Sequence, residues 1–224
     1  FLSIDTYFVT LLSSLIVGLS LMYYGKNSKK NINFIEQLIV IIATYIITSI
    51  LIAIPFYMSN YQVTFINSIF ESVSGLTGTG FSIFKNIKYL DPTLILWRSS
   101  SQWIGGLYFL FFLMIIFSNK SFNFKMTNLT YSGESSFKSE DNIKDNILKI
   151  FIIYSALSIL ILSLLNISGL RLFNSLNMSM TLVSGGGFLP TDSIKKIITT
   201  NFQKIIFIFS LLVSMMNFYL LFNI

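Results

Sequence analysis

Five long stretches of the sequence contain no Asp, Glu, Lys or Arg, and they are residues 6–25, 37–70, 99–119, 150–170 and 205–224. An apolar run of about 18 residues or more can cross the hydrocarbon core of a bilayer as a helix, so the pattern predicts membrane-spanning helices. The second stretch is too long for one helix and contains Pro55, followed by the polar residues Ser59, Asn60 and Gln62. We therefore expect a helix at about 38–57 and then a segment that enters the membrane only part way.

The sequence also contains an internal repeat at an offset of 107 residues, between the stretches that end at Phe81 and Phe188. The identical pairs are Asn67 and Asn174, Ser68 and Ser175, Ser72 and Ser179, Gly78 and Gly185, Gly80 and Gly187, and Phe81 and Phe188. Self-similarity at a fixed offset indicates a structural unit that occurs twice.

Each copy is expected to contain a long helix, a short helix, a Gly-rich stretch and a second long helix. In the first copy these are residues 38–57, 64–75, 76–82 and about 93–118, and in the second copy 145–165, 170–181, 182–188 and 201–224. The predicted fold class is an all-α integral membrane protein with two such units after one extra transmembrane helix. The predicted divisions are 1–30 for the extra helix and its basic loop, 31–118 for the first repeat, 119–144 for a connecting loop and 145–224 for the second repeat.

Composition supports a membrane protein and excludes several other classes. Hydrophobic residues make up 54% of the chain and charged residues 11%, which is too little charge for the surface of a soluble protein of this size. The chain has no Cys and no His, so we expect no soft-metal site, no Ser-His or Cys-His nucleophile and no enzymatic activity. The net charge of +6 is spread along the chain, and we expect a lipid bilayer rather than nucleic acid as partner.

The repeated Gly-rich stretches are the candidate functional residues. Irregular backbone at membrane depth is tolerated only where it is buried in protein or lines a water-filled path. Glycine permits successive carbonyl groups to face one side, and a row of carbonyl and hydroxyl oxygens can replace the water shell of K⁺ or Na⁺. A single such stretch would be interpreted as a tight turn or a close helix contact, but the repetition favours an ion path. The candidate ion-binding residues are Thr77, Gly78, Thr79, Gly80, Ser184, Gly185, Gly186 and Gly187.

A longer motif follows the first Gly-rich stretch, and it carries a family resemblance. Residues 96–106 read Leu-Trp-Arg-Ser-Ser-Ser-Gln-Trp-Ile-Gly-Gly, which is similar to the motif after the first filter of the Trk/Ktr/HKT superfamily of cation transporters. The sequence most resembles the membrane subunit of bacterial Trk-type potassium-uptake systems. Residues 77–81 and 184–188 are similar to the first and second filters of that family, although Gly78 and Gly185 replace its usual hydroxyl residue.

The resemblance implies potassium ions as the transported species, because Gly80 and Gly187 occupy the last filter positions, and it implies no covalently bound cofactor. It also implies four repeats around one pore, of which this sequence holds two, so we expect it to be part of a longer protein. Further implications are a homodimer, a cytoplasmic nucleotide-binding regulatory subunit and a multi-pass location in the cell (inner) membrane. Lys and Arg divide almost evenly between the two predicted sides, so the resemblance alone places the filters at the outer face and loop 119–144 in the cytoplasm.

Three residues near the filters are predicted to support them. Glu71 either attracts cations or bonds to neighbouring backbone, and the second interpretation is favoured. Arg98 either anchors the start of its helix or pairs with an acid, with anchoring favoured. Gln102 either bonds to a filter carbonyl or packs between helices.

Two other functions are compatible with the pattern. A coupled secondary transporter with broken helices would also place irregular backbone deep in the membrane. A membrane scaffold subunit without a transport path would tolerate substitution of Gly80 or Gly187.

Overall fold

The computed structural model describes residues 4–26, 33–118 and 143–215, and the regular structure in those residues is helical throughout. The elements are α1 (Ile4–Gly25), α2 (Phe34–Tyr57), α3 (Phe65–Leu76), η1 (Ile87–Tyr89), α4 (Pro92–Ser118), α5 (Ile143–Ile167), α6 (Leu172–Val183), η3 (Ile194–Lys196) and α7 (Asn201–Ser214). The all-helical fold confirms the predicted fold class. Residues 119–142 of the predicted loop 119–144 and residues 216–224 of the predicted last helix lie outside the described residues.

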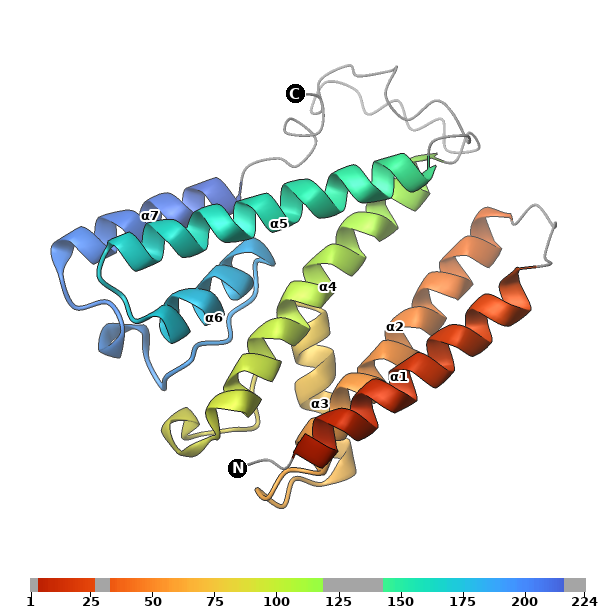
Figure 1. Cartoon of the computed structure of the whole chain (residues 1–224), viewed down its shortest axis with the longest axis horizontal. Helices are drawn as coiled ribbons and strands as arrows, with labels where there is room; N and C mark the ends of the chain where they lie inside the picture. The colour runs from red at the N-terminus through yellow and green to blue at the C-terminus, as the bar shows by residue number, and fades with distance from the viewer. Residues whose placement is uncertain (1–3, 27–32, 119–142, 216–224) are drawn as a thin grey trace.

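Helix α4 lies between the two halves of the molecule (Figure 1). Helices α1 and α2 run side by side on one side of it, and α5 and α7 run side by side on the other. The short helices α3 and α6 both pack against α4. This arrangement brings the ends of the two short helices, which are far apart in the sequence, to the same central helix.

Local signals explain where the helices begin. Helix α2 starts at Phe34, four residues earlier than predicted, because Asn33 and Glu36 form a capping box in which the Asn33 N–H donates to Glu36 Oε2 at 3.0 Å. Helix α6 starts two residues later than predicted. The reason is the turn that ends α5, where Gly169 has a φ of +88° and the Leu170 N–H donates to the Leu165 carbonyl.

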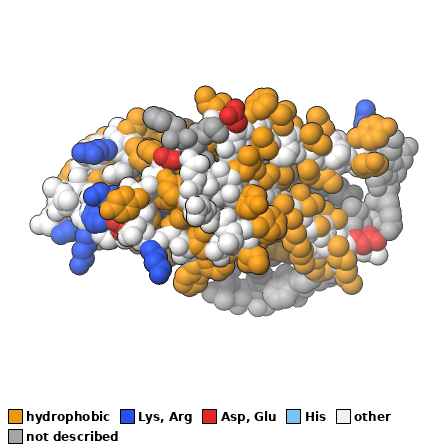
Figure 2. Space-filling model, turned by 90° about the horizontal axis from the view of Figure 1, so that it is seen from below, with side chains coloured by type: hydrophobic (Ala, Val, Ile, Leu, Met, Phe, Trp, Pro, Cys, Tyr) orange, Lys and Arg blue, Asp and Glu red, His pale blue; other side chains and the backbone are white. Residues whose placement is uncertain are grey.

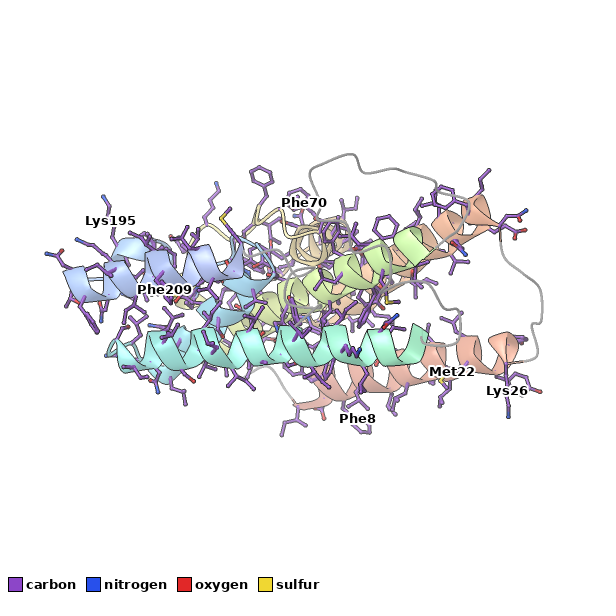
Figure 3. The ribbon with its side chains drawn as sticks, turned by 90° about the horizontal axis from the view of Figure 1, so that it is seen from above. Phe8, Met22, Lys26, Phe70, Lys195 and Phe209 are labelled. Atoms are coloured by element: carbon purple, nitrogen blue, oxygen red, sulfur yellow. The ribbon has the colours of Figure 1, made fainter. Side chains whose placement is uncertain are left out.

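The exterior of the molecule is more apolar than that of a soluble protein. Large apolar side chains such as Met22 are exposed along the long helices, and Phe8 points away from the molecule (Figure 3). Apolar side chains also cover much of the face in Figure 2, whereas Lys and Arg gather toward one end of it. The fully buried side chains, by contrast, include Glu71, Arg98, Gln102 and Asn177. Two apolar clusters fill the rest of the interior. An exterior this apolar is stable in lipid, where polar and charged side chains are kept inside the protein.

Three of the described helices are long and apolar enough to cross a membrane, namely α1, α2 and residues 146–167 of α5. Helix α4 has 27 residues and is therefore about 40 Å long, which also exceeds the hydrocarbon thickness of about 30 Å. The first half of α4 is more polar, because it contains Arg98, Ser99, Ser101 and Gln102. These side chains are buried against the protein, so they do not face lipid.

Candidate functional site

Each Gly-rich loop begins at the C-terminal end of a short helix. Thr77 caps α3 and Ser184 caps α6, and the next residues, Gly78 and Gly185, both have a φ of +69°. A positive φ favours glycine, and in both repeats it turns the backbone out of the helix at the same point. The partial negative charge at each helix end therefore lies beside the start of its loop.

The backbone donors of the loops bond back to the short helices. The Gly80 N–H donates to the Ser74 carbonyl at 3.4 Å, and the Gly186 N–H donates to the Thr181 carbonyl at 2.8 Å. The hydroxyl groups of Thr77 and Ser184 donate to carbonyls of their own helices, at 2.7 and 3.0 Å. Among the described residues, the carbonyl oxygens of 77–80 and 184–187 accept no protein hydrogen bond, so they remain available as ligands.

The two loops approach each other at their last glycines. A Cβ atom on Gly80 would lie 2.9 Å from the Cα of Gly187, and one on Gly187 would lie 3.6 Å from the Cα of Gly80. Gly80 also has a φ of +76°. A side chain at position 80 would therefore strain its own backbone and displace the other loop.

A buried ion pair lies behind the first loop. Arg98 Nε donates to Glu71 Oε1 at 2.8 Å, and the two side chains are 1% and 0% exposed. Glu71 also accepts from the Ile83 N–H at 2.8 Å and from the Ser82 hydroxyl at 3.0 Å, and Arg98 Nη2 donates to Ser82 Oγ at 2.9 Å. This network ties the chain just beyond the first loop to α3 and α4.

The second loop is held by the same helix, α4. The Phe188 N–H donates to Gln102 Oε1 at 3.2 Å, and the guanidinium carbon of Arg98 lies 4.2 Å from the centre of the Phe188 ring. A Cβ atom on Gly186 would lie 2.3 Å from Gln102 Cδ, so the glutamine occupies the space that any other residue at 186 would need. Residues of the first repeat thus define the geometry of the second loop.

Glycines on α4 permit both short helices to approach closely. A Cβ atom on Gly105 would lie 2.0 Å from the carbonyl oxygen of Leu76, the last residue of α3. One on Gly106 would lie 2.4 Å from the Tyr154 hydroxyl and 3.0 Å from the Cα of Ser184. Small residues commonly permit such close approach between membrane helices.

A cavity of about 520 Å³ lies between the loops and the middle of α4. Its lining includes the first residues of both loops, Thr77, Gly78, Ser184 and Gly185, together with the apolar side chains of Phe109 and Leu110. An apolar cavity that opens onto carbonyl and hydroxyl oxygens can hold a hydrated ion before or after it meets the loops.

The outer segments of the two repeats are joined by Asp192. Its Oδ1 accepts from the backbone N–H groups of Ile87 and Lys88, at 2.7 and 3.3 Å, and its Oδ2 lies 2.7 Å from Lys196 Nζ. The hydrogen bond from Lys196 is the largest cause that lowers the pKa of Asp192 below its usual 3.8. The exposed loops therefore gain a cross-link that needs the ionised carboxylate.

The structure brings all the predicted site residues together around α4, and it decides between several alternatives. Glu71 accepts backbone and side-chain hydrogen bonds, as favoured from the sequence. Arg98 pairs with Glu71, which is the alternative that was not favoured from the sequence. Gln102 does bond to the second loop, but it accepts from the Phe188 N–H instead of donating to a filter carbonyl.

Two further residues take part in the site and were missed from the sequence. Ser82 joins the Glu71 and Arg98 network, and Ser74 donates through its hydroxyl to the Phe81 carbonyl. Ser74 and its repeat counterpart Thr181 both carry a hydroxyl group, and this repetition was a signal that could have identified Ser74 as a structural residue. No comparable signal marked Ser82.

The sequence is similar to those of known cation transporters. The sequence matches the TrkH family, described as cation transport proteins, over residues 4–224. An uncharacterized cation transporter of Methanocaldococcus jannaschii is 29% identical over 187 residues, which are 80% of this chain and 38% of that protein. The Trk system potassium uptake protein TrkG of Escherichia coli is 26% identical over 198 residues, which are 83% of this chain and 39% of TrkG.

The fold is similar to that of a solved transporter. The crystal structure of the potassium transporter TrkH from Vibrio parahaemolyticus has a TM-score of 0.79 to this structure at 21% identity, and the match covers 97% of this chain and 44% of that chain. The chain spans about two fifths of the length of the curated relatives it matches.

Proposed function

Because the chain belongs to the TrkH family of cation transport proteins, we propose that it supplies two of the carbonyl-lined loops through which a membrane protein takes up potassium ions. The observation that carries this proposal is the pair of equivalent loops, each turned out of a short helix by a glycine with a φ of +69°. Between them they offer the carbonyl oxygens of residues 77–80 and 184–187, which accept no hydrogen bond within the described part of the chain.

The chemistry follows from neutral oxygen ligands. A dehydrated monovalent cation is stabilised by several carbonyl dipoles, whereas a divalent cation would require carboxylate ligands to offset its larger dehydration cost. Glu71, the carboxylate behind the first loop, is already paired with Arg98 and bonded to the Ile83 N–H. We infer that selection depends on backbone geometry, and that Thr77, Thr79 and Ser184 add hydroxyl oxygens to the loops.

We also propose the cell (inner) membrane as the location of the protein. A homodimer and a cytoplasmic nucleotide-binding regulatory subunit remain predictions that rest on the family resemblance. Purification of the complete protein in mild detergent, with the mass of the complex measured with and without a candidate regulatory subunit, would test both.

The test of function is potassium-dependent growth and rubidium uptake by the complete protein in a bacterium that lacks its own potassium uptake. Gly80→Ser should reduce rubidium uptake or shift preference toward sodium, because the new Cβ would lie 2.9 Å from the backbone of the other loop. Gly18→Ser is the matched control, since a Cβ atom on Gly18 meets nothing within 4 Å. If Gly80→Ser behaves like the control, the loops do not form the path, and a solute transporter or a scaffold becomes the better explanation.

A further inference from the structure

Arg98 contacts structural elements of both repeats with different parts of one guanidinium group. Its edge faces the first repeat, where Nε donates to Glu71 Oε1 at 2.8 Å and Nη2 donates to Ser82 Oγ at 2.9 Å. Its face covers the ring of Phe188, the residue that ends the second loop, at 4.2 Å from the ring centre. Arginine alone combines a planar face with a fork of donors, so lysine could not make both contacts.

Burial makes these contacts rigid. Arg98, Glu71 and Phe188 are 1%, 0% and 1% exposed. If the guanidinium separated from Glu71 inside the protein, both charges would be buried without compensation at a large cost in free energy, so the paired position is favoured. Movement of either partner must then be accommodated by the other.

Two side chains near Arg98 in the sequence or in space, Glu71 and Gln102, accept hydrogen bonds from backbone just beyond the two Gly-rich loops. In the first repeat, Glu71 accepts from the N–H of Ile83, which is two residues beyond Phe81, the residue that ends the first loop. In the second repeat, Gln102, one turn after Arg98 on α4, accepts from the Phe188 N–H. The outermost glycines of the loops, Gly80 and Gly187, lie against each other. A displacement at one loop would therefore be transmitted to the other through α4 as well as through direct contact.

We infer that Arg98 is a shared positioning residue, which couples the geometry of the two Gly-rich loops by holding Glu71 with its edge and Phe188 with its face. This inference rests on the proposed potassium path for its effect on ion preference, but the coupling itself is a property of the fold. It predicts that a change in the second loop alters the first, although 105 residues separate Phe188 from Ile83 in the sequence.

Hydrogen–deuterium exchange of the complete protein in lipid nanodiscs tests the coupling without transport. Phe188→Leu removes the ring face and should speed exchange at the Ile83 amide by about threefold or more. A threefold change lies near the lower limit of the coupling measured between residues in contact. Phe188→Tyr keeps the ring and should leave exchange at Ile83 unchanged. Phe207→Leu is the matched control, because Phe207 is a phenylalanine of α7 that packs against the apolar cluster of the second repeat.

Ion preference gives a second readout. If Arg98 only stabilised the fold, the ratio of rubidium to sodium uptake would not change. The rubidium-to-sodium uptake ratio is measured for Glu71→Gln, Phe188→Leu and the double variant. Coupling through Arg98 predicts that the double variant differs from the product of the single effects by about threefold or more.

The outcomes separate the inference from the proposed function. If Phe188→Leu changes exchange only in its own loop and the two effects on the ratio multiply, Arg98 does not couple the loops, while the potassium path stands. If the wild type takes up no rubidium, the potassium path fails, and exchange at the Ile83 amide still decides the inference.

Discussion

Replacing Gly105 with alanine tests whether close backbone contact between α4 and α3 fixes the first Gly-rich loop. In an ordinary helix interior this substitution stabilises by about 0.5–1 kcal/mol, because glycine loses more backbone entropy on folding. At Gly105 the new Cβ would lie 2.0 Å from the Leu76 carbonyl oxygen, 2.6 Å from its carbonyl carbon and 2.9 Å from its Cα. All three atoms belong to the backbone, so no side-chain rotation can relieve the clash.

The geometry sets the size of the effect. The two helices would have to separate by about 1.4 Å before the closest contact reached 3.4 Å, the start of the ordinary contact range. Overpacking of this kind costs about 1–3 kcal/mol, which exceeds the gain in helix propensity. We expect the free energy of unfolding to fall by about 1–2 kcal/mol. Rubidium uptake should fall as well, because Leu76 leads directly into Thr77.

The assay is unfolding of the purified complete protein by SDS in mixed micelles, followed by circular dichroism. Gly18→Ala on α1 is the control, since its Cβ would meet nothing within 4 Å, and we expect it to be neutral or slightly stabilising. Equal stability of Gly105→Ala and Gly18→Ala would show that the helices do not depend on this contact, and close packing of α4 against α3 could then not be what fixes the first loop.

Buried and exposed polar contacts give three further predictions. Glu71→Gln should lower the free energy of unfolding by about 3–5 kcal/mol in the same SDS assay, because it leaves the charge of Arg98 buried without a counter-ion; a loss below about 1 kcal/mol would contradict this. Ser72→Ala removes the buried hydrogen bond from Ser72 Oγ to the Ser49 carbonyl at 2.7 Å and should cost about 0.5–1.5 kcal/mol by unfolding, since that carbonyl lies inside α2 and keeps its helical hydrogen bond; no measurable loss would contradict this. The carboxylate of Asp192 has a lowered pKa in the folded protein, so its contribution is present at pH 7 and is lost as the pH falls below the usual value of 3.8. The difference in thermal stability between wild type and Asp192→Asn should therefore disappear in acid, and a difference that persists there would assign it to another cause.

The repeat and its loops could be predicted from the sequence because each depends on local pattern. Apolar runs define the long helices, and glycine at equivalent positions marks where the backbone must adopt a positive φ, as Gly78 and Gly185 do. The start of α2 was misplaced although Asn33 and Glu36 carry a capping signature, because the prediction was based on hydrophobicity alone.

The partners of the buried polar side chains could not be predicted in the same way. Glu71 and Arg98 are 27 residues apart, and only the packing of α3 against α4 brings them together. The stacking of Arg98 on Phe188 joins two repeats and depends on the position of a loop that no local pattern specifies. Contacts between elements are set by tertiary packing, and one sequence alone does not reveal it.

The two copies differ at the buried ion pair. Position 178 corresponds to Glu71 at the repeat offset, and it holds Met178, which is 1% exposed and packs in an apolar cluster. A flexible apolar side chain tolerates replacement by another of similar volume, whereas a carboxylate with three donors does not. Tolerance to substitution should therefore differ sharply between these equivalent positions. A chimera built from two second copies would hold a methionine at both positions equivalent to Glu71, and it would have no arginine to hold the neighbouring loop.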